Sequence, residues 1–316
     1  MVADVSSSKV STNSYVVSNL NWNDYMAQKI LIIGLGIMGA PMARNIIKSG
    51  FDVNVCDVRQ DVLNDFEGLV HAKSTKPSQV ACHRNVIITI LPNSDVVEMV
   101  LLGEDGALET AEPNSLVVDM STGSYIKTME IAKLVNKRGH RFVDAPVGRT
   151  PREAISGELL VMAGGRADDI ASLEGIFEAV GDTVIHVGEM GCGLKAKLVN
   201  NYMAMVNNAV TGETLSLASA LGLDINAMAK LMSSTAAGLG QLNTNYPKKV
   251  LTDDLTADFP ISMVIKDLNM AIELATTVNN KAEFGKAALK EFLKAEKAGM
   301  GSLDQTAILK YFISNQ

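Results

Sequence analysis

The stretch KILIIGLGIMGAPMARNII, residues Lys29–Ile47, decides the fold of this 316-residue chain. It opens with a short β-branched run and closes with a helix-like segment. Between them, Gly34, Gly36 and Gly39 follow the pattern G-x-G-x-x-G. That pattern is weak alone, but a strand before it and a helix after it are its context in dinucleotide-binding domains. The stretch therefore predicts a strand-turn-helix unit that holds a pyrophosphate.

Each glycine has a separate expected role in that turn. Gly34 makes the tight turn, Gly36 lets the backbone approach the pyrophosphate, and Gly39 lets the helix pack closely on the strand. The unpaired N–H groups at the helix N-terminus face the diphosphate. The candidate cofactor contacts therefore also include Ile37 and Met38, which lie between the last two glycines.

An acidic residue ends the next apolar run, because Asp57 lies 21 residues past Gly36. A carboxylate at this position accepts the ribose hydroxyls of NAD and repels the extra phosphate of NADP. Asp57 therefore favours NAD as the cofactor, although Arg59 keeps some tolerance of NADP open. The alternative, a glycine-rich turn followed by a surface aspartate, does not account for strand, glycines, helix and acid in register.

Short apolar runs alternate with amphipathic stretches of helical length from Lys29 to about His186. The runs are β-branched and bounded by Gly, Asp, Asn or Pro, which is typical of βαβ units in a parallel sheet. The sequence leaves open whether the later runs pair in parallel. The runs are Ile30–Ile33, Val53–Cys56, Val86–Leu91, Leu116–Val118, Phe142–Val143, Leu159–Ala163 and Val184–His186.

The composition changes after Gly193. Residues Leu194–Leu221 contain no Pro and one Gly, and as a helix they would be about 42 Å long. Further helical stretches follow at Ile225–Ser233, Ile261–Val278, Lys281–Ala298 and Asp304–Ser314. The predicted fold class is α/β: a flexible N-terminal extension (1–27), a Rossmann-type domain (28–190), and an all-helical domain (191–316) joined to it by the long interdomain helix.

Composition and charge exclude several classes of function. The net charge of −7 argues against a nucleic-acid surface, and no apolar run reaches the length of a membrane span. The three cysteines form no C-x-x-C pair and the four histidines have no metal-ligand spacing, so we expect neither a disulfide framework nor a metal site. Without a signal or transit peptide, a cytoplasmic protein is expected.

Two further strand ends are expected to face the cofactor, because ligands bind outside the carboxyl ends of the strands in such sheets. These are Leu91-Pro92-Asn93 and Asp119-Met120-Ser121-Thr122. Leu91, Ser121 and Thr122 are therefore candidate contacts to the nicotinamide ribose or the substrate. The alternative that Ser121 and Thr122 only cap a helix is equally consistent with the sequence.

The segment GCGLKAKLVNNYM opens the long helix and carries the candidate catalytic group. Lys197, Asn200 and Asn201 share one helix face with Ala204 and Asn208. A lysine held in a cleft can donate a proton to a carbonyl oxygen while hydride reaches the carbon, and an amide can hold that oxygen or the lysine. Desolvation lowers a lysine pKa and suits it to this task. A solvated first helical turn is the alternative.

These motifs together resemble the β-hydroxyacid dehydrogenase family, which includes 3-hydroxyisobutyrate dehydrogenase. The resemblance runs in order from about Lys29 to the C-terminus. It implies an NAD-dependent oxidoreductase acting on a CH–OH group, Lys197 as the catalytic residue, Asn200 and Asn201 as substrate contacts, and Lys266 beside the nicotinamide. It also implies a homodimer or homotetramer. The motifs are GLGIMGAPMARN, D-x-S-T at Asp119–Thr122, FVDAPV at Phe142–Val147, GELLVMAGG at Gly157–Gly165, GCGLKAKLVNN, and IKDL at Ile265–Leu268.

One segment departs from the family pattern. Most members carry Ser-Gly-Gly where this chain has Gly148-Arg149-Thr150. This variant resembles the 3-sulfolactaldehyde reductases of the family, as do NNYM at Asn200–Met203, STAAG at Ser234–Gly238 and YPKKVLTDDL at Tyr246–Leu255. The resemblance implies reduction of 3-sulfolactaldehyde to 2,3-dihydroxypropane-1-sulfonate, a step of sulfoquinovose degradation. Arg149 and Thr150 are candidate sulfonate contacts, because a guanidinium fork suits an anion with three oxygens.

Two alternatives remain open at this point. The first is a γ-hydroxybutyrate (succinic semialdehyde) or 3-hydroxyisobutyrate dehydrogenase, because Arg149 can also bind a carboxylate. The second is a dinucleotide-sensing protein without catalysis, which has no need for an acid in its cleft.

Overall fold

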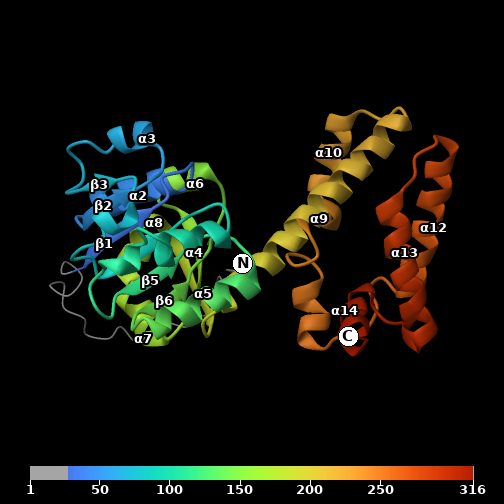
Figure 1. Ribbon diagram of the computed structural model, residues 1–316. Coiled ribbons are helices and arrows are strands. Elements are labelled where there is room, and N and C mark those ends of the chain that lie inside the picture. The colour runs from blue at the N-terminus through green and yellow to red at the C-terminus, as the bar shows by residue number, and fades with distance from the viewer. Residues whose placement is uncertain (1–27, 316) are drawn as a thin grey trace, which may run out of the picture. The chain divides into compact units, whose positions relative to one another are not determined.

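The structure, a computed structural model, describes residues 28–315 (Figure 1). The chain forms two compact units that divide between Asn201 and Tyr202. The predicted extension at residues 1–27 lies outside the described residues. The division between the units falls inside the long helix, after the domain boundary that we propose from the sequence at residues 190 and 191.

One sheet of nine strands forms the centre of the first unit, in the order β3-β2-β1-β4-β5-β6-β8-β7, with β9 paired to β8. The strands from β3 to β6 are parallel, as the βαβ pattern predicts. Strand β8 is antiparallel to β6 and β7 but parallel to β9, which settles the pairing that the sequence left open. The strands are Lys29–Ile33 (β1), Asp52–Cys56 (β2), Lys73–Ser74 (β3), Val86–Thr89 (β4), Leu116–Asp119 (β5), Arg141–Asp144 (β6), Val147–Gly148 (β7), Leu159–Gly164 (β8) and Gly181–Gly188 (β9).

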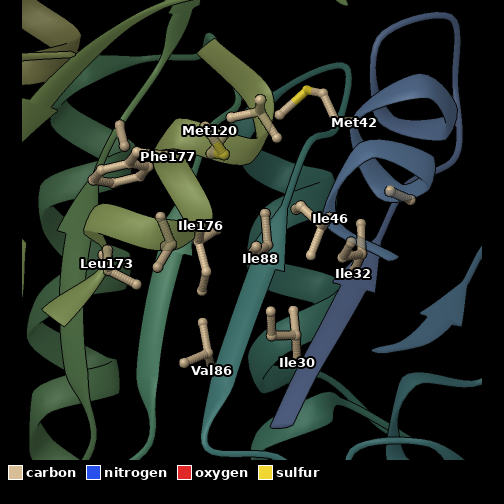
Figure 2. Close-up of a cluster of buried hydrophobic side chains, with 14 of the residues drawn as sticks. Ile30, Ile32, Met42, Ile46, Val86, Ile88, Met120, Leu173, Ile176 and Phe177 are labelled. Atoms are coloured by element: carbon tan, nitrogen blue, oxygen red, sulfur yellow. The ribbon is translucent and has the colours of Figure 1, made fainter. Parts of the chain in front are cut away.

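Helices cover both faces of this sheet. Side chains of β1 alternate between two apolar cores, with Ile30 and Ile32 in one and Leu31 and Ile33 in the other, as expected for a sheet buried on both sides. Figure 2 shows part of the first core, in which strand side chains such as Ile30 and Ile88 lie beside helix side chains such as Ile46 and Ile176. The helices are Gly39–Lys48 (α2), Gln60–Asn64 (α3), Ser94–Leu102 (α4), Tyr125–Lys137 (α5), Pro151–Ser156 (α6), Ala167–Ser172 (α7) and Glu174–Val180 (α8), with 3₁₀ turns at Pro77–Gln79 and Ala107–Glu109.

The second unit is helical, and its residues 202–315 contain no named strand. A small apolar core of Ile261, Ile265, Ala295, Ala307 and Ile308 holds its C-terminal helices together. Helix α9 begins at Cys192, two residues before the predicted start, and ends at Ala220. The other elements are Ile225–Ser233 (α10), Ala236–Leu239 (α11), Ile261–Thr277 (α12), Glu283–Ala295 (α13) and Ile308–Ser314 (α14), with short turns at Tyr246–Lys248, Val250–Thr252, Glu296–Met300 and Gln305–Ala307.

Within residues 28–315, no helix is long and apolar enough to cross a membrane. The same residues hold no cluster of three or more His, Cys, Asp or Glu side chains that could bind a metal ion. Cys56, Cys82 and Cys192 are all free thiols.

Candidate active site

The turn between β1 and α2 requires glycine at two positions and leaves space at a third. Gly34 has a φ of +101°, and a Cβ on it would lie 2.3 Å from the Ile90 oxygen. A Cβ on Gly39 would lie 1.9 Å from the Gly34 oxygen. A Cβ on Gly36, in contrast, would meet no protein atom within 4 Å. Gly34 and Gly39 are therefore needed for the fold, whereas Gly36 keeps open a space that a ligand can enter, which fits a dinucleotide.

A pocket of about 860 Å³ lies beside this turn, which is a usual size for a small-molecule site. It brings together most of the predicted cofactor contacts: Gly34, Gly36, Ile37, Met38, Gly39, Asp57 and Leu91. The rest of the wall includes Arg59, Thr75, Lys76, Pro77, Val96, Met99 and Val100. Apart from Arg59, these residues belong to no motif. The segment Thr75–Pro77 follows a strand of only two residues, which no apolar run reveals.

Asp57 is buried at the edge of the pocket and is held by the turn. One carboxylate oxygen accepts the backbone N–H of Leu35 at 2.7 Å, and the other accepts the backbone N–H and the Nε–H of Arg59 at 2.9 and 3.2 Å. Burial acts to raise the pKa of Asp57, but these hydrogen bonds and the Arg59 charge together hold it below 3.8. Asp57 is therefore ionised at neutral pH.

The neighbouring thiol has the opposite tendency. Cys56 is 2% exposed and contributes to the same pocket wall. Burial, and then the negative charge of Asp57, raise the pKa of Cys56 to about 12. This thiol stays protonated at neutral pH.

Ser121 supports the pocket wall from the next strand. Its Oγ accepts the backbone N–H of Leu91 at 2.9 Å, while its own N–H donates to Asp119 at 3.0 Å. Asp119 is buried and also accepts the Thr89 hydroxyl at 2.9 Å. Burial raises the pKa of Asp119. Thr122, the neighbouring candidate, is half-buried beside this network.

Neither Ser121 nor Thr122 caps the helix that follows. The N-cap of α5 is Ser124, whose side chain accepts from Lys127 N–H. The capping alternative for Ser121 and Thr122 is therefore wrong, and Ser121 instead fixes the end of β4 through Leu91.

The first turns of α9 carry the candidate catalytic residues. Lys197 is half-buried, and no hydrogen bond or ion pair reaches its ammonium from any of the residues 28–315. Burial lowers the pKa of Lys197. Asn200 and Asn201 follow on the next turn, where Nδ2 of Asn200 donates to Oδ1 of Asn201 at 3.5 Å. An ammonium with a lowered pKa beside two amides can act as a proton donor.

Asp144, which the sequence did not mark as a site residue, binds the start of this helix. It ends β6, is 1% exposed, and accepts the backbone N–H groups of Gly191 and Leu194, each at 2.6 Å. Burial raises the pKa of Asp144 to about 6, despite these hydrogen bonds, and the charge of Asp119 acts in the same direction.

Arg149 is paired within the first unit. It has a φ of +75°, and its Nη1 donates to Oδ2 of Asp182 at 2.7 Å and to the backbone oxygen of Glu158. Nη2 lies 3.4 Å from the Thr183 hydroxyl. The sequence did not predict this ion pair. Because of it, an anionic substrate would have to compete with Asp182 for the guanidinium.

Thr150 has a local structural role at the start of α6. Its hydroxyl accepts Arg152 N–H at 3.3 Å, and its backbone N–H donates to Glu153 at 2.9 Å. Lys266 belongs to the second unit, where it lies on α12 with its ammonium 3.1 Å from Asp267. Substrate contact by Thr150 and cofactor contact by Lys266 both stay predictions.

Comparison with known families finds two matching domains. Residues 29–218 match the NAD binding domain of 6-phosphogluconate dehydrogenase. Residues 191–312 match the NAD-binding domain of NADP-dependent 3-hydroxyisobutyrate dehydrogenase. The cofactor is therefore NAD(P).

Individual proteins extend the similarity over most of the chain. The 3-sulfolactaldehyde reductase of Escherichia coli (strain K12) is 38% identical over 281 residues, which cover 89% of this chain and 94% of that protein. The mitochondrial 3-hydroxyisobutyrate dehydrogenase of Mus musculus is 30% identical over 285 residues, covering 88% and 85%. The structure of Mycobacterium tuberculosis 3-hydroxyisobutyrate dehydrogenase with L-serine aligns with a TM-score of 0.62 and 26% identity, covering 90% and 99%. These similar proteins have different substrates.

Proposed function

Because this chain belongs to the β-hydroxyacid dehydrogenase family, we propose that it reduces 3-sulfolactaldehyde to 2,3-dihydroxypropane-1-sulfonate with NADH. The family makes it an oxidoreductase that acts on a CH–OH group. The sulfonate substrate is supported by the Escherichia coli relative and by the segment Gly148-Arg149-Thr150.

The half-buried Lys197 ammonium, whose pKa is lowered by burial, is the observation that supports this type of reaction. When bound, a reduced nicotinamide would supply a hydride to the aldehyde carbon. As the carbonyl electron pair moves to oxygen, the Lys197 ammonium donates its proton there and later recovers one from water. Its ammonium is suited to this step because burial lowers its pKa and no described side chain competes for its N–H groups. Asn200 and Asn201 can hold the same oxygen or the lysine by their amides.

Asp57 supports a preference for NAD over NADP. An ionised carboxylate has about four lone-pair sites. Asp57 uses three of them for the N–H groups of Leu35 and Arg59, so Oδ2 retains about one acceptor site for a ribose hydroxyl. Its negative charge repels a 2′-phosphate. The Arg59 guanidinium is already paired with Asp57 at 3.2 Å, which leaves it less available to a phosphate.

Arg149 is the proposed sulfonate contact. Its Nη atoms already meet Asp182, Glu158 and Thr183, whereas its Nε has no hydrogen-bond partner among residues 28–315. A sulfonate can bind through Nε and displace the Asp182 carboxylate from the fork, because all three sulfonate oxygens are acceptors.

A carboxylate substrate is the second candidate. Its support is the Arg149–Asp182 pair itself, because a carboxylate already lies on this guanidinium at 2.7 Å. Succinic semialdehyde and the aldehyde of 3-hydroxyisobutyrate would place their carboxylates there.

A nicotinamide absorbance assay separates these functions. The substrates are 3-sulfolactaldehyde, succinic semialdehyde and a neutral aldehyde of similar size. We expect the highest kcat/KM with the sulfonate. Highest efficiency on succinic semialdehyde would favour the carboxylate alternative, and NADH binding without turnover of any substrate would favour a dinucleotide sensor.

A further inference from the structure

The start of α9 is attached to the sheet by one side chain. The first N–H groups of a helix lack intrahelical partners and carry the positive end of its dipole. Here the Asp144 carboxylate accepts two N–H groups at this end, those of Gly191 and Leu194, at 2.6 Å each. Lys197 follows Leu194 by less than one helical turn. The Asp144 carboxylate therefore binds the N-terminal end of α9, within one helical turn of the proposed proton donor.

Two glycines lie close to this carboxylate. A Cβ on Gly193 would lie 3.0 Å from Oδ2 of Asp144, and a Cβ on Gly164 would lie 2.6 Å from its Oδ1. The Gly164 Cβ would also lie 2.5 Å from the Gly193 nitrogen. Two glycines thus let the helix, β8 and the carboxylate meet in close contact.

A second contact fixes the same helical turn from its other side. The Lys195 ammonium lies 4.9 Å from the centre of the Tyr125 ring at the start of α5. A Cβ on Gly191 would lie 2.8 Å from Sδ of Met129, also on α5. The helix start is therefore held between β6 and α5.

We infer that Asp144 is a positioning residue for hydride transfer, because its carboxylate fixes the first turn of α9 and with it the placement of the Lys197 ammonium. This inference rests on the proposed role of Lys197. The reacting atoms must be placed closely for catalysis, and a small displacement of a catalytic group costs a large part of the rate.

A pH dependence follows from the surroundings of Asp144. The charged groups that act on it are Asp119 from β5 and Lys195 from α9, while β8 contributes only Gly164 beside it. Burial raises the pKa of Asp144 to about 6. Below that pH the protonated acid is a weaker acceptor, so the attachment of α9 weakens and kcat should fall.

The test compares Asp144→Asn with Asp169→Asn. Asp169 is a matched control, because it is also buried and pairs with Arg141 of β6, but it accepts no N–H from α9. We expect Asp144→Asn to lower kcat roughly ten- to a hundredfold and to remove the acid limb of the kcat profile near pH 6. The NADH Kd, measured by fluorescence, should barely change. Asp169→Asn should lower thermal stability while kcat and the acid limb remain.

The outcomes separate this inference from the proposed function. Normal turnover in Asp144→Asn, with turnover lost in Lys197→Ala, would contradict the positioning role alone. Normal turnover in Lys197→Ala would contradict the proposed function. If Asp144→Asn does not fold, Asp144→Glu decides. It keeps the charge but lengthens the side chain, so it should retain an acid limb and lower kcat, and an unchanged kcat would overturn the inference.

Discussion

Two buried aspartates at the carboxyl edge of the same sheet behave in opposite ways. Asp57 and Asp144 each accept two backbone N–H groups. Yet the pKa of Asp57 is lowered, whereas that of Asp144 is raised to about 6. The difference lies in depth and in neighbouring charge. Asp57 borders a pocket and pairs with Arg59, whereas Asp144 is more deeply buried and feels Asp119.

The comparison shows that the number of hydrogen-bond donors does not alone set the charge of a carboxylate. Desolvation and the sign of the nearest charge decide it. As a result, Asp57 beside the pocket keeps its negative charge at neutral pH, whereas the charge of Asp144 beside helix α9 titrates near pH 6.

The largest effect is expected from replacing Lys197, the proposed proton donor on α9, and cofactor binding should remain intact. Lys197→Ala should lower kcat by roughly 10²–10⁴-fold. NADH affinity should barely change, because Lys197 does not line the cofactor pocket. Steady-state kinetics and NADH fluorescence titration measure the two quantities. Lys197→Arg should also have a low kcat, since a guanidinium does not release its proton near neutral pH. Near-normal turnover in either variant would contradict Lys197 as the proton donor.

The two aspartates should also differ in how they link stability to pH. Asp144 binds its proton more tightly when folded, because its pKa rises from 3.8 to about 6. Its contribution is therefore fully present below pH 3.8 and is lost as the pH rises through 6. At about 1.4 kcal/mol per pKa unit, the wild type should lose this contribution between pH 4 and pH 7 while Asp144→Asn does not. The free energy of unfolding of Asp144→Asn should therefore rise by on the order of 3 kcal/mol relative to that of the wild type over this range.

Asp57→Asn is the matched comparison for that measurement. The lowered pKa of Asp57 means that its contribution is present above 3.8 and is lost only at lower pH. The difference in unfolding free energy between Asp57→Asn and wild type should stay level from pH 4 to pH 7 in urea denaturation. Parallel slopes for the two variants would show that their environments do not differ as described.

Asp57→Ser sharpens the comparison at the cofactor end. Loss of the acceptor and of the repelling charge should shrink the NADH to NADPH ratio of kcat/KM by about ten- to a hundredfold, as expected for a hydrogen bond to a charged group. With saturating NADH, kcat should stay near the wild-type value. Equal use of NADPH and NADH by the wild type would contradict the role of Asp57 in cofactor preference.

Arg149→Ala addresses the substrate anion and has the narrowest expected effect. Loss of a charged hydrogen bond of about 1.5–3 kcal/mol should lower kcat/KM on 3-sulfolactaldehyde roughly ten- to a hundredfold. Loss on a neutral aldehyde of similar size should be much smaller. Asp182→Asn is the control, because it frees the guanidinium and should lower KM for the sulfonate. Equal losses on both aldehydes in Arg149→Ala would show that Arg149 shapes the pocket without binding the anion.

Local patterns predicted much of this molecule. The β-branched runs and the glycine pattern are read within a few residues, and they correctly indicated the parallel strands, the turn from Gly34 to Gly39 and the long helix α9. Asp57 and Leu91 were predicted as cofactor contacts because they follow strands, and both line the pocket; cofactor contact by either residue stays a prediction.

The sequence did not predict contacts between residues that lie far apart along the chain. Asp144 meets Gly191 and Leu194 across 47 and 50 residues, and Arg149 meets Asp182 across 33. No periodicity encodes such pairs, because they depend on how β6, β8 and β9 come together in the folded sheet. The same applies to the pocket wall at Thr75–Pro77, which a two-residue strand positions.

The Cys56 thiol gives the cofactor pocket a resistance to oxidation. Peroxides and alkylating reagents attack the thiolate, and with a pKa of about 12 only about one Cys56 in 10⁵ is ionised at pH 7. Cys82, which is exposed, is open to such reagents at the surface. Burial, and then the negative charge of Asp57, thus keep the Cys56 sulfur in its unreactive form, so oxidative damage should begin away from the pocket.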